Sequence, residues 1–575
     1  MKIELDHFAG MAPLVDKTKL QDHFASDANN TVFNRGAISQ NPVTMEQDSA
    51  IDPPETLTNM VYFDDGTAFG FRQEDNIPSS IGLRSLVRPR DEFRRLYFLG
   101  KNGLRVATSR ASMQGASYTP GEFQMLEVGR HFKVGVGMDS NARPTVDQRV
   151  IDPNHDDEEI PLDVLRVQWI YTLVDGFGHE GPPSAPSAPM EVPYNATWRV
   201  RLRNFNTSGL NGCYTNGAVI RIYRGAFDGS TSEFQFVADV PLGTAWFFDG
   251  NYGVNASGIA LGDEMEVVPS ISWDQPPYSQ DGEKPMQSLV SVGSNFFAGH
   301  YDNMLCYSVY KMAHAWPTQY RFPLTYEIVN MVAVDSGILI ATKGKPYWAF
   351  GADPESAVPV ELDANYPCLS AKSLVRLGTF GVYATYDGLV GVEGGQTRVL
   401  TEQHITREDW VEHFKPHEIR AFAIEGRYYF SVDEQWWVFD PADSGGFSKV
   451  DLSPIAPSDV YDISYDLSKD EVVVLTTDKR IFRAKIKESG AMEWISHQWV
   501  IAPNNFSCAR VDATDDAENL RLVVIKDGVE DEYPVEPGVV RPIKAGLARR
   551  WQMGVRCDSG RIHSIGLAQL AEEFR

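Results

Sequence analysis

The amino-acid sequence predicts an all-β protein, a β-propeller of about 6–8 blades that carries an inserted β-sandwich. The first observation is a repeated unit of hydrophobic strand, tight polar turn and second strand, which recurs from Leu289 almost to the C-terminus. The second is the spacing of about 40 to 50 residues between first turns, the usual length of a propeller blade. The third is the frequency of Asp-Gly and Asn-Gly turns between alternating strands.

The repeat is clearest in the stretch 289–351. Its first strands, 289–292 and 328–334, end in the turns 293–295 and 335–337, and its second strands are 296–298 and 338–342. Because alternate residues of a blade strand face the core between neighbouring sheets, we expect certain mid-strand residues to be buried: Leu339, Val382, Tyr429 and Val473. Later copies of the repeat are 374–392, 419–439 and 460–484.

The N-terminal region, 1–163, is predicted to hold an extended arm followed by the first propeller strands. The arm, 1–52, is weakly periodic and is expected to pack on another surface. Two hairpins follow, with turns at Asp65-Gly66 and Asn102-Gly103. Since open sheet edges invite aggregation, we expect the N-terminal strands and the C-terminal hairpin to close the propeller.

A separate module is predicted at 164–268, within the propeller sequence. Several short alternating strands with turns at Asp228-Gly229 and Leu242-Gly243 indicate a small β-sandwich of the fibronectin type III or immunoglobulin-like kind. A Pro-rich linker, 269–285, then leads back to the main part of the propeller, 286–575, which ends in closing strands. We expect the module to fold largely on its own and to lie outside the ring.

Composition limits the possible partners and compartments. A formal net charge of −26 argues against general binding to the nucleic-acid backbone, which requires Lys and Arg to neutralise phosphates. The five cysteines are far apart and lack a C-x-x-C pair, so we expect buried reduced thiols. No N-terminal apolar h-region and no apolar run of about 18 residues is present, so neither a cleaved signal nor a membrane-spanning segment is predicted.

Four groups of residues invite a chemical function, and for each a structural interpretation is favoured. The arginines between 84 and 95, here called the arginine cluster, fit a solvated or subunit-contact face. The acidic run 156–159 lacks the ligand spacing of a calcium-binding loop. His413 and His417 have helical metal-site spacing, but Pro416 interrupts it. The aromatic pairs are expected to pack in the core. The residues are Arg84, Arg88, Arg90, Arg94 and Arg95; Asp156, Asp157, Glu158 and Glu159; His413 and His417; Tyr428, Tyr429, Trp436 and Trp437.

No catalytic, cofactor-binding or metal residues are assigned, and we expect no cofactor and no enzymatic activity. The repeated Asp-box turns of sialidase-type propellers are absent, as are the G-x-S-x-G, Walker A and G-x-G-x-x-G patterns. Carboxylates are abundant, but a glycosidase pair is defined by a separation in space.

Several long runs resemble the nozzle-like tail proteins of short-tailed, podovirus-type bacteriophages. They are CYSVYKMAHAWPTQY at 306–320, LIATKGKPYWAFG at 339–351 and CLSAKSLVRLGTFGVYATYDGLVGV at 368–392. The segment beginning YTLVDGFGHEGPPSAPS at 171 looks like the fibronectin-like module found in such proteins. Further similarity covers 493–511, 564–574 and the N-terminal run 7–30.

The resemblance implies a virion structural protein, synthesised in the host bacterial cytoplasm and located in the phage tail. It implies a β-propeller subunit of a homo-oligomeric ring, typically a homohexamer, that forms the nozzle or distal tail tube for genome ejection. The implied partners are the tail adaptor and portal-proximal proteins, with tail fibres as a further candidate. Genomic DNA would pass through the channel without specific binding.

Two expectations remain open. The alternative function is a receptor-binding or carbohydrate-active tail protein on a propeller scaffold. The acidity suggests that the bore of an assembled ring carries more Asp and Glu than Lys and Arg, with the arginine cluster facing away from the duplex. A simpler explanation is that the charge keeps an exposed virion surface soluble.

Overall fold

The computed structural model describes most of the chain. Outside the described residues are 35, 63–67, 73–85, 88–94, 101–102, 109–122, 126–130, 140, 151–163, 194–196, 203–206, 227–233, 250–274, 278–285, 294, 335–336, 352, 442–445, 467–468, 470, 488–489 and 575.

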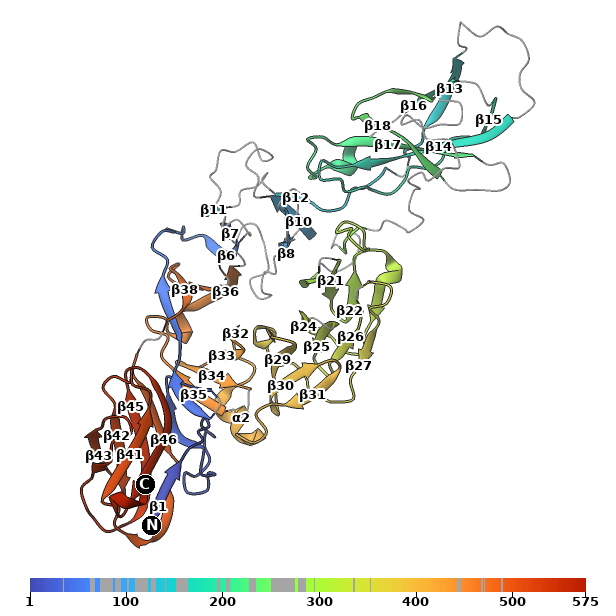
Figure 1. Ribbon diagram of the computed structural model, residues 1–575. Coiled ribbons are helices and arrows are strands. Elements are labelled where there is room, and N and C mark those ends of the chain that lie inside the picture. Colours follow the sequence, from blue (N-terminus) through green and yellow to red (C-terminus); the bar gives the residue numbers. More distant parts are fainter. Residues whose placement is uncertain are drawn as a thin grey trace.

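Antiparallel four-stranded sheets, each formed by consecutive strands, make up the middle of the molecule (Figure 1). The first sheet joins β20 (Ser288–Val292), β21 (Phe296–Tyr301), β22 (Met304–Tyr307) and β23 (Arg321–Pro323). The second joins β24 (Ile328–Val334), β25 (Gly337–Thr342), β26 (Tyr347–Ala349) and β27 (Pro359–Glu361). The third joins β28 (Val375–Leu377), β29 (Phe380–Thr385), β30 (Gly388–Glu393) and β31 (Gln396–Val399).

Two further units continue this pattern towards the C-terminus. One consists of β32 (Ala421–Ile424), β33 (Arg427–Val432), β34 (Gln435–Asp440) and β35 (Gly446–Val450), preceded by helix α2 (Arg407–Phe414). The other consists of β36 (Val460–Asp466), β37 (Glu471–Thr476) and β38 (Ile481–Ile486), and its fourth strand is the N-terminal β5 (Val43–Gln47). The expected N-terminal closing strand is therefore present.

The next strands after β5 begin two more sheets. One contains β6 (Leu57–Tyr62), β7 (Ala68–Arg72) and β11 (Phe123–Met125). The other contains β8 (Leu86–Val87), β9 (Arg95–Gly100), β10 (Gly103–Thr108) and β12 (His131–Lys133). Pairing of Tyr62 with Ala68, and of Gly100 with Gly103, confirms both predicted hairpins, although residues 63–67 and 101–102 lie outside the described residues.

Neighbouring sheets pack face to face around a ring. Phe71 of β7 contacts Phe98 of β9, with ring centroids 4.9 Å apart, and Tyr97 contacts Phe297 of β21 at 5.2 Å. Buried clusters join the remaining neighbours, including β36–β38 with β6 and β7, and β32–β34 with β36–β38. The protein is thus all-β, and this ring of mainly antiparallel sheets is β-propeller-like.

The four residues expected in mid-strand confirm the predicted register. They lie in β25, β29, β33 and β37, and none is more than 1% exposed: Leu339, Val382, Tyr429 and Val473. The five cysteines are also free and buried, as expected.

The strands from 492 onwards do not belong to the ring, although 286–575 was predicted to be the main part of the propeller and to end in closing strands. They form a lobe with the N-terminal arm, and strand 25–29 of that arm also pairs with β35 of the ring (Figure 1). Its strands are β1 (Lys2–Leu5), β2 (Ala25–Asn29), β3 (Thr31–Asn34), β4 (Ala37–Gln40), β39 (Met492–Ser496), β40 (Trp499–Asn504), β41 (Cys508–Ala513), β42 (Arg521–Lys526), β43 (Val529–Pro534), β44 (Arg541–Pro542), β45 (Ala548–Cys557) and β46 (Arg561–Ala568). We call this the terminal lobe.

Two related expectations are corrected by the terminal lobe. The C-terminal strands β45 and β46 neither form the expected hairpin nor close the ring, because β46 pairs with β1, β4 and β41, and β45 pairs with β39, β40 and β42. The arm packs on its own chain, since all five of its strands pair with other strands of the protein. Strand alternation alone could not reveal this, because it does not identify pairing partners.

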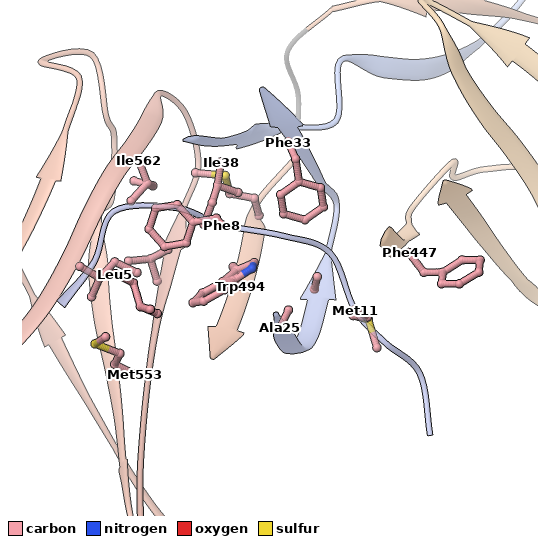
Figure 2. Packing of buried hydrophobic residues seen from close by; sticks show 14 of the residues in the cluster. Leu5, Phe8, Met11, Ala25, Phe33, Ile38, Phe447, Trp494, Met553 and Ile562 are labelled. Atoms are coloured by element: carbon pink, nitrogen blue, oxygen red, sulfur yellow. The ribbon is translucent and has the colours of Figure 1, made fainter. Parts of the chain in front are cut away.

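A continuous core joins the terminal lobe to the ring, and Figure 2 shows part of it. Phe8 packs edge to face on Trp494 at 4.9 Å, and Trp494 Nε1 donates to Ala9 O. The backbones of Met11 and Phe447 exchange two hydrogen bonds, of 2.7 and 3.2 Å. We call this join the seam.

The strands between β12 and β20 form two sheets over a core of their own. One sheet joins β14 (Val164–Val174), β15 (Met190–Pro193), β17 (Val219–Ala226) and β18 (Phe234–Pro241). The other joins β13 (Thr145–Val150), β16 (Thr197–Arg201) and β19 (Trp246–Asp249). Because β13 and the buried Val136 and Ala142 belong to this module, it begins before the predicted boundary at 164.

Candidate functional site

The strands nearest the middle of the ring are the first strands of their sheets. β6 contacts β36, β20 contacts β24, and β28 lies between β24 and β32 (Figure 1). Polar side chains recur where these strands begin. We define the central cluster as Asn59 on β6, Lys372 before β28, Arg420 before β32 and Asp462 on β36.

Backbone irregularities accompany the polar residues of this region. The strand register shifts immediately before Asn59 in β6, before Asn330 in β24 and before Asp462 in β36. Such bulges redirect side chains away from the regular alternation of a sheet. Asn59 Nδ2 then donates to Asp462 Oδ2 at 3.1 Å, which connects two neighbouring sheets.

The turn that carries Lys372 is held from both sides. Asn330 Nδ2 of one neighbouring sheet donates to Ala371 O at 2.8 Å, and Tyr428 OH of the other donates to Ser373 O at 2.7 Å. Ser373 Oγ also donates to Ser370 O within the turn. The main chain beside Lys372 is therefore fixed before any ligand binds.

The charges of the central cluster act on one another. Burial lowers the pKa of the Lys372 ammonium and the Arg420 guanidinium lowers it further, whereas Asp462 opposes the shift. Burial raises the pKa of the Asp462 carboxyl, against the hydrogen bond from Asn59 and the two nearby cations. All three charged side chains remain partly exposed, so solvent reaches them.

The sequence analysis did not identify the central cluster. Its signal is a recurrent polar residue in the third position of the repeat: Leu57-Thr58-Asn59, Ile328-Val329-Asn330 and Val460-Tyr461-Asp462. Each of these three-residue copies, taken alone, is typical of an ordinary strand start. Lys372 and Arg420 approach the central cluster only because the sheets are arranged in a ring.

The histidine pair does not form a helical metal site. Helix α2 ends at Phe414, and Lys415 adopts a left-handed conformation with φ 41° before Pro416, as the sequence predicted. His413 and His417 are both exposed, and His413 Nδ1 lies 3.2 Å from Asp409 O. Within the described residues, no group of three or more His, Cys, Asp or Glu side chains could hold a metal ion.

Three of the four singled-out aromatic residues are core residues, as predicted. Tyr428, Tyr429 and Trp436 are at most 3% exposed. Tyr429 stacks on Phe422 with ring centroids 5.2 Å apart. Trp437 is partly exposed and packs beside Phe414 at 5.1 Å.

Most of the predicted arginine cluster and all of the acidic run lie outside the described residues: Arg84, Arg88, Arg90, Arg94, Asp156, Asp157, Glu158 and Glu159. Arg95 is described, and its Nη1 donates to Phe177 O at 3.2 Å and lies 3.4 Å from His179 Nε2. This arginine therefore contacts a loop of the module within its own chain.

The loop Asp175–Glu180 joins the module to the ring. His179 Nδ1 lies 3.0 Å from Asp175 Oδ2, and its Nε2 lies 3.1 Å from Tyr97 OH of β9. Phe177 enters the ring's hydrophobic cluster and stacks on Tyr214 at 4.7 Å. A small polar network and two aromatic residues, Phe177 and Tyr214, thus hold this joint.

A basic and aromatic face lies on the β13–β16–β19 sheet of the module. Arg199 and Arg201 stand over the Trp246 ring at 4.0 and 4.9 Å from its centroid, and Phe248 is 57% exposed. Arg199 is paired across the strands with Phe248, and Arg201 with Trp246. We call these four residues the module face.

The terminal lobe presents a surface of opposite charge. Asp515, Asp516 and Glu518 lie in one exposed turn, and Asn519 Nδ2 donates to the exposed Asp558 Oδ2 at 2.5 Å. No ion pair joins any of these carboxylates to another residue that the structure describes. We call Asp515, Asp516, Glu518 and Asp558 the acidic turn; it lies on the terminal lobe, at the end of β41 and β46 away from the chain termini.

The described helices include none with the length and apolar character needed to cross a bilayer.

No protein-family model matches the chain, and no curated protein matches it. Solved structures that are similar include the extracellular domain of a proposed hybrid two-component system from B. thetaiotaomicron, with 10% identity and a TM-score of 0.27. The alignment covers 85% of this chain and 47% of that one, so the chain spans about half its length.

Two other solved structures have similarly low sequence identities and TM-scores. The Pan2 WD40 domain from Neurospora crassa has 9% identity and a TM-score of 0.25, over 47% of this chain and 85% of that one. A chain of the mitotic checkpoint complex has 6% identity and a TM-score of 0.26, over 76% and 92%. The fold described above rests on strand pairing and not on these similarities.

Proposed function

We propose that this chain is a structural subunit of the tail of a short-tailed bacteriophage and that it assembles into a homo-oligomeric ring around the genome-ejection channel. The observation that carries the proposal is the resemblance of long ordered runs, among them 306–320, 339–351 and 368–392, to nozzle-like tail proteins. The function proposed is architectural: the ring would hold its neighbours in the tail and let DNA pass.

The architecture we propose is a seven-bladed propeller with an inserted fibronectin-like sandwich. The blades are the sheets that begin with β6, β8, β20, β24, β28, β32 and β36, and the last is completed by β5. The module between β12 and β20 supplies the sandwich. Packing between successive sheets all the way around the ring supports this count.

Charge complementarity supports association of several copies. The module face is cationic and aromatic, the acidic turn is anionic, and the two lie on different bodies of the molecule, the module and the terminal lobe (Figure 1). Two different complementary surfaces favour a head-to-tail contact, which produces a ring when the rotation closes. Arg and aromatic residues are also the types that contribute most at protein interfaces.

Electron microscopy and mass photometry of the purified protein test the proposal. We expect rings, typically hexamers, and their loss when Arg199 and Arg201 are both replaced by Glu. Replacing Asp515 and Asp516 by Lys in the same chain should restore assembly, because the charges are exchanged. Arg480→Glu, at an exposed arginine of the ring sheet β36–β38, is the control and should leave assembly unchanged.

A different result would favour the alternative function. Monomers at all concentrations, together with cleavage of host polysaccharide or binding to whole cells, would indicate a carbohydrate-active or receptor-binding tail protein. If rings form, the charge of their bore tests the acidic-channel expectation, since a neutral or basic bore would contradict it.

A further inference from the structure

Two cations of the central cluster share one nearby carboxylate, Asp462, and neither forms an ion pair with a residue that the structure describes. Arg420 Nη1 donates to the main-chain Val460 O, and Lys372 forms no ion pair with a described residue. Asp462, the nearby carboxylate, already accepts from Asn59. Placing two partly buried cations together is unfavourable unless an anion compensates them.

Asn59 provides an independent sign of a missing ligand. It is 2% exposed, and within the described residues its Oδ1 accepts no hydrogen bond. Its Nδ2 is committed to Asp462, which fixes the orientation of the amide. Because buried acceptors are nearly always satisfied, Asn59 Oδ1 calls for a donor that the described residues do not supply.

The missing partner must therefore accept from the cations and donate to the amide oxygen. We propose that the central cluster binds a singly protonated phosphate group, free or as a monoester. Its charged oxygens accept from Lys372 Nζ and the Arg420 guanidinium, and its P–OH donates to Asn59 Oδ1. Sulfate has the same size and charged oxygens but no proton to donate at neutral pH, so it binds more weakly.

The surroundings favour a preformed site. The turn bearing Lys372 is held by Asn330 and Tyr428, and Ser431 N donates to Arg420 O at 3.0 Å. Rigid supports reduce the ordering cost of binding, and Arg matches the geometry of phosphate oxygens. The site is independent of the proposed tail function, because it uses neither the module face nor the acidic turn.

Isothermal titration calorimetry of the full chain with inorganic phosphate tests the site. A parallel titration with adenosine 5′-monophosphate distinguishes free phosphate from a monoester, and sodium sulfate at equal ionic strength tests the need for a proton donor. We expect one phosphate per chain and at least about tenfold weaker binding of sulfate. Lys372→Gln and Arg420→Gln should each weaken phosphate binding at least about tenfold, as expected for loss of a charge-assisted hydrogen bond.

Arg376→Gln is the matched control, because this exposed arginine lies on β28, just after the turn that carries Lys372, but is not part of the cluster. It should bind phosphate like the unchanged protein. Absence of phosphate binding, equal affinity of Lys372→Gln, or sulfate binding as tight as phosphate would each overturn the proposal.

Thermal melting without phosphate separates a binding role from a structural one. Lys372→Gln removes a desolvated ammonium that is repelled by Arg420, so its melting temperature in phosphate-free buffer should equal or exceed that of the unchanged protein. Added phosphate should raise the melting temperature of the unchanged protein and not that of the variant. A lower melting temperature for the variant without phosphate would show that Lys372 supports the fold.

Discussion

The module and the terminal lobe are both β bodies attached to the same ring, but they are attached in different ways. The module is formed by one continuous stretch of chain and has its own core. The terminal lobe takes strands from both ends of the chain, and its core continues into that of the ring. The module is joined to the ring through Phe177, Tyr214 and a small polar network, whereas the terminal lobe is joined by the seam, where a buried core continues from one body into the other.

The difference shows how chain connectivity determines cooperativity. A contiguous body with few external contacts can unfold or be removed without taking strands from the rest. The terminal lobe cannot, because the arm that supplies β1–β4 goes on to supply β5, the closing strand of the ring. We therefore expect the ring and the terminal lobe to unfold as one unit and the module as another.

Deletion gives the largest contrast between the two bodies. The connections into and out of the module lie side by side, since Gly135 contacts Gln275 and Pro276. Replacing 137–274 with a short Gly-Ser linker should leave a folded ring. Removing 1–41 should prevent folding, because β46, which also pairs with β41, would lose its partners β1 and β4 and the core that they cover would be exposed. Circular dichroism and gel filtration would show the outcomes, and a folded protein lacking 1–41 would contradict the shared-core interpretation.

Weakening the aromatic contact at the joint should uncouple the module. Phe177→Ala removes a buried ring that stacks on Tyr214 and enters the ring's cluster, at a cost of about 3–5 kcal/mol at the joint. Calorimetry should then show the module melting earlier while the main transition stays unchanged. Phe236→Ala, at a partly buried residue of β18, serves as control, and a fall in the main transition with Phe177→Ala would show that the joint supports the ring.

The seam should be sensitive to a single methyl group. A Cβ on Gly10 would lie 2.7 Å from Gly446 C and 2.9 Å from Phe447 N, which are backbone atoms that cannot move aside cheaply. Gly10→Ala should lower the free energy of unfolding of the combined ring and terminal lobe by about 1–3 kcal/mol, measured by urea denaturation. Gly546→Ala is the matched control in the terminal lobe, because nothing lies within 4 Å of its added Cβ.

Mild acid should affect the terminal lobe through its ion pairs. Hydrogen bonds from Arg556 and Arg521 lower the pKa of Glu532. A carboxyl with a lowered folded pKa stabilises the protein above its unfolded pKa, and that contribution is lost as the pH falls through the folded pKa. Stability should therefore decline modestly as the pH falls below about 4.5, the ordinary pKa of a glutamate, and less in Arg556→Gln. An equal decline in the variant would exclude these pairs as the cause.

Thiol labelling can follow both bodies without changing the fold. Burial raises the pKa of Cys213 in the module, and that of Cys368 in the ring, to about 12, so neither forms thiolate at pH 8 in the native protein. In rising urea, Cys213 should be labelled first. Cys368, Cys508 and Cys557 should be labelled together at higher urea, because the ring and terminal lobe share a core. Simultaneous labelling of all these thiols would show that the module does not unfold separately from the ring and the terminal lobe.

The sequence predicted the strands well because each strand depends on local information. Alternation and turn residues specify where a strand begins, ends and faces, so Leu339, Val382, Tyr429 and Val473 were identified as buried mid-strand residues. The spacing of the repeat likewise indicated antiparallel sheets made from consecutive strands. The end of α2 before Pro416 followed from the chemistry of proline.

Two features depended on pairing between distant segments, and local patterns carry no information about them. Strands 548–557 and 561–568 look like further repeat strands, yet both belong to the terminal lobe. The second pairs with the N-terminal arm, and the first pairs with 492–496, 499–504 and 521–526. Residues of the central cluster, such as Lys372 and Asp462, come from different sheets and are near one another only because the ring closes. The sequence by itself therefore determined an all-β chain with a blade-length repeat. Only the tertiary structure decided which strands form the ring and which charges meet at its centre, because strand partners and through-space electrostatics are set by long-range packing.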